Sequence, residues 1–207
     1  METYLSKVKQ VLSKIEETQL EALNQAAQIC TEALFQERQL FFFGTGHSHM
    51  LAEEPFYRAG GLKPIKPILE TGLMLHEGEV KSTALERLEG YADILLDHYQ
   101  VTAGDVLFVI SNSGVNAVPV EMALGAKKRG AKVIALTSLD HSKQMTSRHQ
   151  SGRKLFEIAD LVLDNCGCYG DAAVQLEQYP ITVGPTSTIA GAFMINAITV
   201  QIAKNYE

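Results

Sequence analysis

The 207-residue chain has few cysteines: only Cys30, Cys166 and Cys168. An odd number of cysteines without the spacing of a disulfide framework favours a reducing compartment, so we expect a cytoplasmic protein. Cys166 and Cys168 also lie too close together in sequence for a Cys-x-x-Cys redox motif. We therefore interpret the three thiols as incidental to function.

The sequence also lacks an excess of basic residues. It contains 18 Lys and Arg against 24 Asp and Glu, which gives a formal net charge of −6 at pH 7. Nucleic-acid binding requires clustered cations that neutralise phosphates, so this balance argues against nucleic acid as a partner. A small anionic ligand is not excluded, because backbone N–H groups bind phosphate without any side-chain charge.

No long uninterrupted apolar segment is present. Residues 1–14 alternate charged and apolar side chains and do not resemble a signal peptide. The most apolar late stretch, residues 189–203, contains Asn196, Thr199 and Gln201 and is too short to cross a bilayer. We therefore expect no membrane association, and the hydrophobic content of 46% is ample for one core.

The order of apolar patterns predicts an α/β fold. Residues 4–35 repeat apolar side chains at helical spacing, with a break near residues 13–17. Strands and helices then alternate, which predicts right-handed crossovers and a parallel sheet with helices on both faces, a three-layer α-β-α sandwich. We expect strands at 40–43, 64–69, 105–110, 132–137 and 159–163, helices at 49–59, 82–98, 117–129 and 141–149 and from Pro185 onward, and a hairpin within 164–184.

This order divides the chain into two parts. Residues 1–36 form an N-terminal helical extension that we expect to cover a partner subunit in a homodimer. Residues 37–207 form the α/β domain, in which ligands are expected at the carboxyl ends of the strands. Residues 44–48, 111–116 and 137–142 fall at that edge.

The clearest strand is followed by Ser-Asn-Ser-Gly at residues 111–114. The helix that follows offers unpaired N–H groups and a partial positive charge, the serines add hydroxyl donors, and Gly114 allows a close backbone approach. These features are typical of a phosphate site. The alternative is that Ser113 or Asn116 simply caps the helix.

A second loop, Gly-Thr-Gly-His-Ser at residues 44–48, follows the first strand. It lacks the third glycine of the GxGxxG dinucleotide motif, and no Gly-Lys-Ser/Thr follows as in a P-loop. We therefore expect a small phosphate or sugar ligand and no cofactor.

These loops, with Gly-Ala-Lys-Val-Ile-Ala-Leu-Thr at residues 130–137, resemble the successive signatures of the SIS (sugar isomerase) domain over about residues 35–205. The chain resembles stand-alone bacterial SIS-domain proteins related to phosphoheptose isomerase. It also resembles the N-acetylmuramic acid 6-phosphate etherases at residues 88–90 and 184–188. The resemblance implies a flavodoxin-like parallel sheet, phosphate held by Ser111 and Ser113, and a phosphorylated-sugar site often shared between the subunits of a homodimer or homotetramer.

The resemblance leaves the reaction open. Isomerisation needs a base over the sugar carbon and a group that moves oxygen protons, roles that Glu and His usually fill. Glu53 and Glu54 follow the first loop, Glu89 lies in the etherase-like Leu-Glu-Gly, and His76 lies in an acidic loop. For each carboxylate the alternative is a solvated helix face, and for His76 an ordinary surface loop. The candidate catalytic residues are Glu53, Glu54, Glu89 and His76.

The candidate ligand-binding residues lie in the two loops and at the start of the last helix. His47 and His49 are polar loop residues, sugar contacts or metal ligands; without a further recognisable ligand they are weak evidence for zinc, so no metal site is predicted. Thr186, Ser187 and Thr188 either contact the sugar or cap the helix. The candidates are Gly46, His47, Ser48, His49, Ser111, Asn112, Ser113, Asn116, Thr186, Ser187 and Thr188.

The leading hypothesis is an aldose–ketose isomerase acting on a phosphorylated sugar. A lyase that releases lactate from an amino sugar 6-phosphate is the alternative within enzymes. A non-catalytic phosphosugar sensor is the alternative outside them, although the N-terminal helices lack the basic face of a DNA-binding module.

Overall fold

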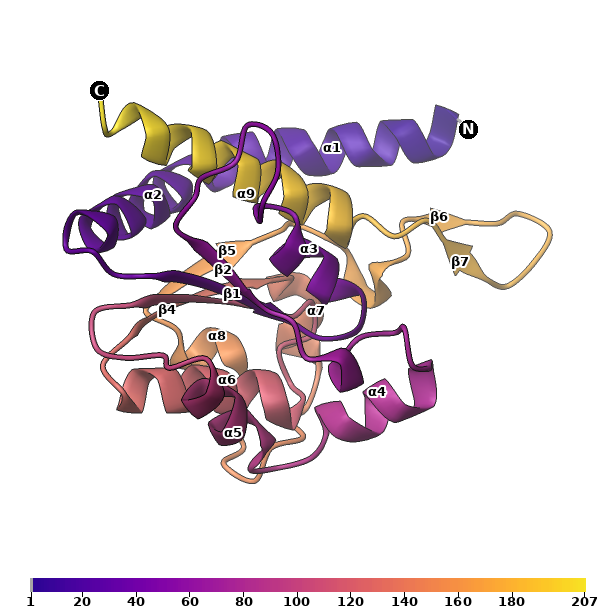
Figure 1. Cartoon of the computed structure of the whole chain (residues 1–207). Helices are drawn as coiled ribbons and strands as arrows, with labels where there is room; N and C mark the ends of the chain where they lie inside the picture. The colour runs from indigo at the N-terminus through magenta and orange to yellow at the C-terminus, as the bar shows by residue number, and fades with distance from the viewer. Residues whose placement is uncertain (1) are drawn as a thin grey trace.

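The computed structural model describes residues 2–207 and contains a central sheet of five parallel strands in the order β2-β1-β3-β4-β5 (Figure 1). The register pairs Gly44 with Ile110 and Ile110 with Leu136, so the carboxyl ends of β1, β3 and β4 lie side by side. The strands are β1 (Leu40–Gly44), β2 (Ile65–Ile68), β3 (Val106–Ile110), β4 (Lys132–Thr137) and β5 (Leu161–Asp164).

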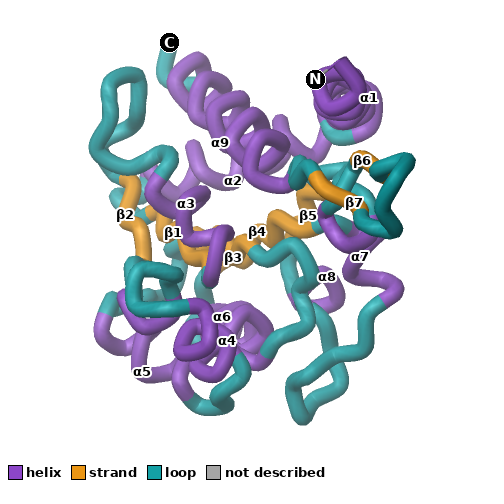
Figure 2. Tube along the Cα trace, turned by 90° about the vertical axis from the view of Figure 1, so that its right-hand side faces the viewer, coloured by secondary structure: helices purple, strands orange, loops and turns teal. Residues whose placement is uncertain are grey.

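Helices cover both faces of the sheet, which confirms the predicted three-layer sandwich (Figure 2). One layer holds α1 (Glu2–Thr18), α2 (Leu20–Phe35), α3 (His49–Glu53) and α9 (Ser187–Lys204). The other holds α4 (Glu79–Glu86), α5 (Tyr91–His98), α6 (Ala117–Lys128) and α8 (Leu155–Ile158). The short α7 (Leu139–Gln144) follows β4 at the carboxyl edge.

The apolar run in β1 divides between two cores. Leu40 and Phe42 pack with α2, α3 and α9, whereas Phe41 and Phe43 pack with α5 and α6 on the opposite face. Successive side chains of a strand point to opposite faces, so a strand covered on both sides must be apolar throughout. Phe42 stacks on Phe108 of β3 with ring centroids 4.3 Å apart.

The N-terminal segment forms two helices that break at Gln19. Leu23, Ala27 and Cys30 of α2 are buried in the same core as Leu40. The second helix of the predicted extension is therefore packed onto the sheet domain, where it lies against α9 in one layer (Figure 1).

Several element boundaries differ from those predicted. The helix after the first loop ends at Glu53 because Pro55 follows and has no backbone N–H to continue the helical hydrogen bonds. The predicted helix over 82–98 is two helices, α4 and α5, separated by Gly90, which has a φ of 83°. Pro185 precedes Thr186, the N-cap of α9, instead of lying in its first turn.

Three further features complete the fold. The predicted hairpin is present as β6 (Val174–Gln175) and β7 (Thr182–Val183), which project away from the sheet (Figure 1). Short 3-10 turns occur at η1 (Gly46–Ser48), η2 (Thr71–Leu73) and η3 (Tyr169–Asp171). Across residues 2–207, no helix has both the length and the apolar character needed to cross a membrane.

Candidate functional site

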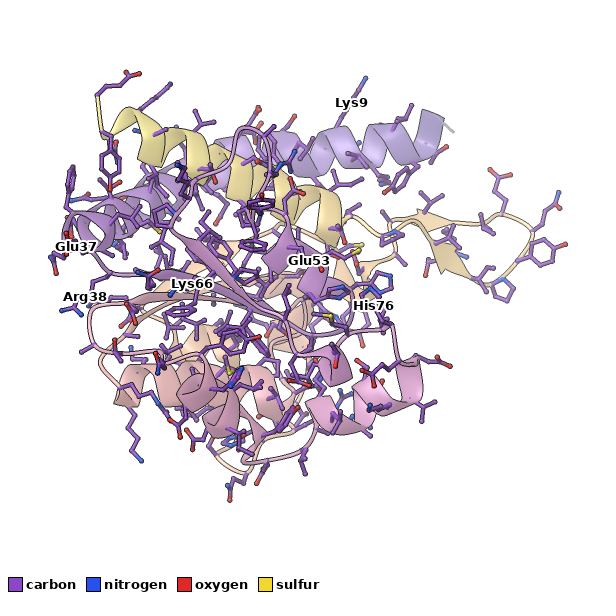
Figure 3. All side chains as sticks on the ribbon, viewed as in Figure 1. Lys9, Glu37, Arg38, Glu53, Lys66 and His76 are labelled. Carbon is purple, nitrogen blue, oxygen red and sulfur yellow. The ribbon has the colours of Figure 1, made fainter. Side chains whose placement is uncertain are left out.

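A narrow cleft lies where the carboxyl ends of β1, β3, β4 and β5 meet the N-terminus of α9. Its volume is about 10 Å³, which is too small to hold a sugar phosphate. A larger hollow of about 610 Å³ lies at the opposite end of the sheet beside Arg38 and Lys66 (Figure 3). The cleft lining is His47, Ser48, Leu51, Ile110, Asn112, Leu136, Asn165, Ser187 and Thr188.

The loop after β1 turns sharply into η1. A Cβ on Gly44 would lie 2.4 Å from the carbonyl oxygen of Ser48, so only glycine permits this turn. The Ser48 N–H donates to Thr45 O at 2.9 Å, and the Thr45 hydroxyl donates to the Glu86 carboxylate of α4. Glu86 therefore positions this loop, a role that the sequence pattern did not reveal.

The loop at 111–116 is held by its carbonyl oxygens. In a trans peptide the C=O and the following N–H point in opposite directions, so these bonds also set where the N–H groups point. The bonds run from Ser138 N and Thr137 Oγ1 to Asn112 O (3.1 and 3.2 Å), from Leu155 N to Gly114 O (2.8 Å) and from Arg148 N to Val115 O (2.8 Å).

The matching N–H groups belong to Ser113, Val115 and Asn116. None of the three has a hydrogen-bond acceptor within residues 2–207. Unpaired N–H groups close together at the start of a helix form a concave donor surface that suits a phosphate. The predicted phosphate loop thus has its donors fixed in direction and unused by the fold.

Gly114 is essential to this geometry. Its φ is 62°, and a Cβ there would approach Leu155 Cβ to 3.1 Å. Its N–H donates to the hydroxyl of Ser111 at 3.1 Å, so the oxygen of the buried Ser111 closes the turn. The hydroxyl of Ser113 is the serine donor of this loop that is partly exposed.

Asn165, which follows β5, is hydrogen-bonded to the loop at 111–116. Its Oδ1 accepts from Gly167 N at 2.9 Å and its Nδ2 donates to Asn112 Oδ1 at 2.9 Å. Because a backbone N–H can only donate, the first contact sets the orientation of the Asn165 amide. The amide of Asn112 is consequently held by its oxygen, and its NH₂ group remains available at the cleft.

Asp171 of η3 caps α9. Its Oδ1 accepts from the backbone N–H groups of Thr186 (2.9 Å) and Ser187 (3.0 Å), and its Oδ2 accepts from Ser187 Oγ (2.6 Å). This carboxylate occupies the place that an anion would take at the helix N-terminus. The Thr186 hydroxyl is buried without a hydrogen-bond partner in the described part of the chain. Thr188 and Ser187 still line the cleft.

Three predicted residues come together beside the first loop. The His49 Nε2 lies 3.9 Å from the Glu53 carboxylate, and the rings of His49 and His76 are 5.2 Å apart. Figure 3 shows Glu53 and His76 at the same end of the sheet. The Nδ1 of His49 contacts Gly46 O, an acceptor, so Nδ1 carries a proton. The Nε2 is then the atom able to exchange a proton with Glu53 or a ligand.

The other two candidate carboxylates, Glu54 and Glu89, make contacts away from His49. The Glu54 carboxylate pairs with Arg58 and accepts from Asn196 Nδ2 of α9 at 2.9 Å. The Glu89 carboxylate accepts from Gln150 N at 2.8 Å, on the side of α6. The structure therefore groups Glu53 with His49 and His76 and places Glu54 and Glu89 in other contacts.

Two titratable groups near this edge have shifted pKa values. Burial lowers the pKa of His141, against the influence of Asp171 and Asp140. Burial raises the pKa of the Cys166 thiol, although the Thr18 hydroxyl opposes it. Both groups are therefore held in their uncharged forms near neutral pH. Within residues 2–207, no three His, Cys, Asp or Glu side chains gather in a way that could hold a metal ion.

Comparisons with known proteins agree with the observed fold. A UPF0309 protein of Caldanaerobacter subterraneus subsp. tengcongensis is 44% identical over 208 residues, covering 99% of this chain and 85% of the relative. The phosphoheptose isomerase of Neisseria gonorrhoeae superposes with a TM-score of 0.64 at 21% identity, covering 97% of this chain and 95% of the isomerase. An Escherichia coli CFT073 protein, solved in complex with a phosphosugar, superposes with a TM-score of 0.60 at 18% identity, covering 100% and 90%.

The two structural similarities show a shared fold. The model of the family described as "SIS domain" matches residues 3–138, which include both loops at the carboxyl edge. The sequence resemblance found at residues 44–48 and 111–116 is thus confirmed, and the chain belongs to the SIS domain family.

Proposed function

We propose that the protein binds a phosphorylated sugar at the carboxyl edge, with the phosphate on the loop at 111–116. The observation that carries this proposal is the set of three unpaired N–H groups at Ser113, Val115 and Asn116. The Ser113 hydroxyl and the NH₂ group of Asn112 add side-chain donors. The phosphosugar complex of the Escherichia coli protein with the same fold supports this ligand class.

The proposed reaction is aldose–ketose isomerisation. Glu53 acts as the base that takes a proton from one sugar carbon and returns it to the neighbouring carbon. His49, or His76 beside it, moves the proton between the two sugar oxygens. The 3.9 Å separation of His49 Nε2 and the Glu53 carboxylate supports this pairing, because both groups then reach the same two-carbon unit. The phosphoheptose isomerase with the same fold supports the reaction class.

We further propose a homodimer or homotetramer whose subunits share the site. Among the 18 residues of α9 only Lys204 is charged. Yet Ile189 and Val200 are 41% and 56% exposed, and Phe56, which follows α3, is 44% exposed. Such apolar exposure on one layer supports burial against another subunit. Light scattering during gel filtration tests the oligomeric state, and a monomer at micromolar concentration would refute this part.

A cytoplasmic location remains our proposal. All three cysteines are free thiols in the structure, and Cys30 is buried. This supports a reducing compartment. Cell fractionation with an antibody tests it, and recovery outside the cytoplasm would contradict it.

The test of the reaction is isotope exchange. The purified protein is incubated in D₂O with heptulose, pentose and hexosamine phosphates, and incorporation of deuterium at C1 or C2 is followed by NMR. Isomerisation predicts exchange that is lost in Glu53→Gln and retained in Glu54→Gln. The Glu54 variant is the matched control, because its carboxylate contacts α9.

The other outcomes are equally defined. Lactate released from a 3-O-lactyl amino sugar phosphate would identify a lyase instead. Sugar-phosphate binding without exchange or lactate would identify a sensor. Absence of any phosphate binding would refute the site itself.

A further inference from the structure

The segment that joins α7 to α8 has a defined relation to the phosphate loop. It carries no helix or strand between residues 145 and 154, and it descends past α6 before it returns to α8 (Figure 2). We call residues 148–155 the strap. Its two ends, Arg148 N and Leu155 N, donate to the adjacent carbonyls Val115 O and Gly114 O, each at 2.8 Å. The strap therefore holds two consecutive peptide groups of the phosphate loop.

The strap is also held by contacts to Glu89 and to α6. Gln150 N donates to Glu89 Oε1 at 2.8 Å, and His149 Nε2 lies 3.5 Å from Glu121 Oε1 of α6. The Glu121 carboxylate also accepts from Gly90 N at 2.8 Å. His149 is buried, so this end of the strap is packed as well as hydrogen-bonded. These contacts fix the backbone of the strap, and with it the position of Arg148 beside Asn116.

Arg148 makes a specific contact with Asn116. Its Nη1 donates to Asn116 Oδ1 at 2.6 Å. A guanidinium carries only donors, so the Asn116 atom that it touches must be the amide oxygen. The NH₂ group of Asn116 then points away from Arg148, and it has no acceptor within residues 2–207. No carboxylate of the described chain lies within ion-pair distance of Arg148.

The side chain of Asn116 does not make the capping hydrogen bond expected at its position. It is the N-cap of α6, with φ −76° and ψ 155°, but its side chain makes no capping hydrogen bond. An N-cap Asn ordinarily accepts from an N–H of the first helical turn. Here the acceptor oxygen is taken by Arg148, and the residue is only 7% exposed. The capping alternative for Asn116 is thus absent, and its two side-chain N–H donors lie in the phosphate loop without a partner among residues 2–207.

We infer that Arg148 is a positioning residue of the phosphate site: it holds the amide oxygen of Asn116 and thereby presents the NH₂ group of Asn116 to the bound phosphate. The inference rests on the proposed function and adds a side-chain donor to the three backbone N–H groups. Arg148 acts through Asn116 and not by its own contact with the anion. Arg148, 32 residues away from Asn116 in sequence, thus becomes part of the binding site.

A double-mutant cycle with inorganic phosphate as the ligand tests the inference. Titration calorimetry or NMR on Arg148→Met, Asn116→Ala and the double variant should show affinity about 10-fold weaker for each single variant. The double variant should be no weaker than Asn116→Ala, because Arg148 has nothing left to position. Additive losses, or an unchanged affinity in Arg148→Met, would overturn the inference.

Two further variants separate positioning from folding. Asn116→Asp keeps the oxygen that Arg148 holds but places a negative charge where the NH₂ group was, so phosphate binding should be lost while the Tm is retained. Retained phosphate affinity in Asn116→Asp would overturn the inference. Arg153→Met is the matched control, because Arg153 also lies in the strap but donates to Glu157 O at 2.6 Å. It should bind phosphate as the wild type does.

The wild-type titration distinguishes the two proposals. If the wild-type protein binds neither inorganic phosphate nor any sugar phosphate, the proposed function fails. If the wild type binds and Arg148→Met binds equally well, only the role of Arg148 fails.

Discussion

The amide groups of Asn112 and Asn165 are joined by a 2.9 Å hydrogen bond across the end of β4. The two residues follow β3 and β5, which are not neighbours in the sheet. A single contact therefore spans three strand ends and determines which end of the Asn112 amide faces the cleft. Asn165 is 1% exposed and is also bonded to Gly167 N, so it cannot rotate without losing both bonds.

Replacing Asn165 by Ala should lower both stability and phosphate affinity. The substitution leaves Gly167 N and the Asn112 oxygen without partners, and an unsatisfied buried polar group costs about 1–3 kcal/mol. Urea denaturation measures the first effect and phosphate titration the second. Asn24→Ala is the control, because Asn24 lies exposed on α2 and should change neither value. A phosphate affinity equal to that of the wild type would show that Asn112 needs no such support.

Replacing Gly114 by Ala should abolish phosphate binding. The alanine adopts a left-handed backbone at a cost of about 1–2 kcal/mol, and its Cβ meets Leu155 Cβ at 3.1 Å. The contact displaces the end of the strap from the loop. Gly152→Ala is the matched control, since Gly152 has a φ of 68° with no atom within 4 Å of an added Cβ. It should show a similar backbone strain and retain phosphate binding; equal loss of binding in both variants would contradict this explanation.

Replacing Asp171 by Ala should destabilise the protein by about 1–2 kcal/mol, the usual cost of losing an N-cap side chain. Three hydrogen bonds at the start of α9 depend on this carboxylate. Ser187→Ala removes only one of them and should cost less, as measured by the urea midpoint of both variants. The reverse order would show that Asp171 is not the capping residue.

Asp160 should make stability depend on acid pH. Burial opposes its ionisation, but hydrogen bonds from Lys127 Nζ and Val133 N outweigh burial and lower its pKa below the ordinary 3.8. The folded state thus binds the proton more weakly than the unfolded state. The contribution is complete above pH about 3.8 and is lost as the pH falls through the lower folded value. Asp160→Asn should flatten this part of the stability–pH curve; an unchanged slope would refute the assignment.

The three thiols should react with a thiol reagent in a set order. Cys168 is partly exposed and should react first, whereas burial raises the pKa of Cys166 and slows it. Burial raises the pKa of Cys30 further, so Cys30 should react only after unfolding. Labelling of variants that each retain one cysteine measures the three rates. Fast labelling of Cys30 in native buffer would mean that α2 opens readily from the sheet.

The strands and the two ligand loops could be predicted from the sequence because their signals are local. Phe41 and Phe43 lie in a continuous apolar run that only a doubly covered strand requires. Gly44 and Gly114 occur where a turn leaves such a strand, and both are required there by the structure. The split of the helix over 82–98 was not predicted, because the apolar spacing on either side of Gly90 is helical and does not itself indicate a break.

The contacts of the candidate carboxylates could not be predicted from local sequence patterns. Glu53 and Glu54 are adjacent in sequence, yet one lies beside His49 and the other beside Asn196. Successive helical residues point about 100° apart, so the packing of the helix alone decides which one lies beside His49. Likewise Glu86 contacts Thr45, whereas Glu89 holds the strap at Gln150.

By itself the sequence determined the α/β sandwich, its SIS-domain membership and the edge at which the proposed phosphate loop lies. All three follow from short segments whose apolar spacing and glycines act within a few residues of one another. Only the tertiary structure decided that Arg148 holds Asn116 and that Asp171 caps α9. The physical reason is that these contacts join distant segments through single hydrogen bonds, and a hydrogen bond between remote side chains leaves no periodic pattern in the sequence.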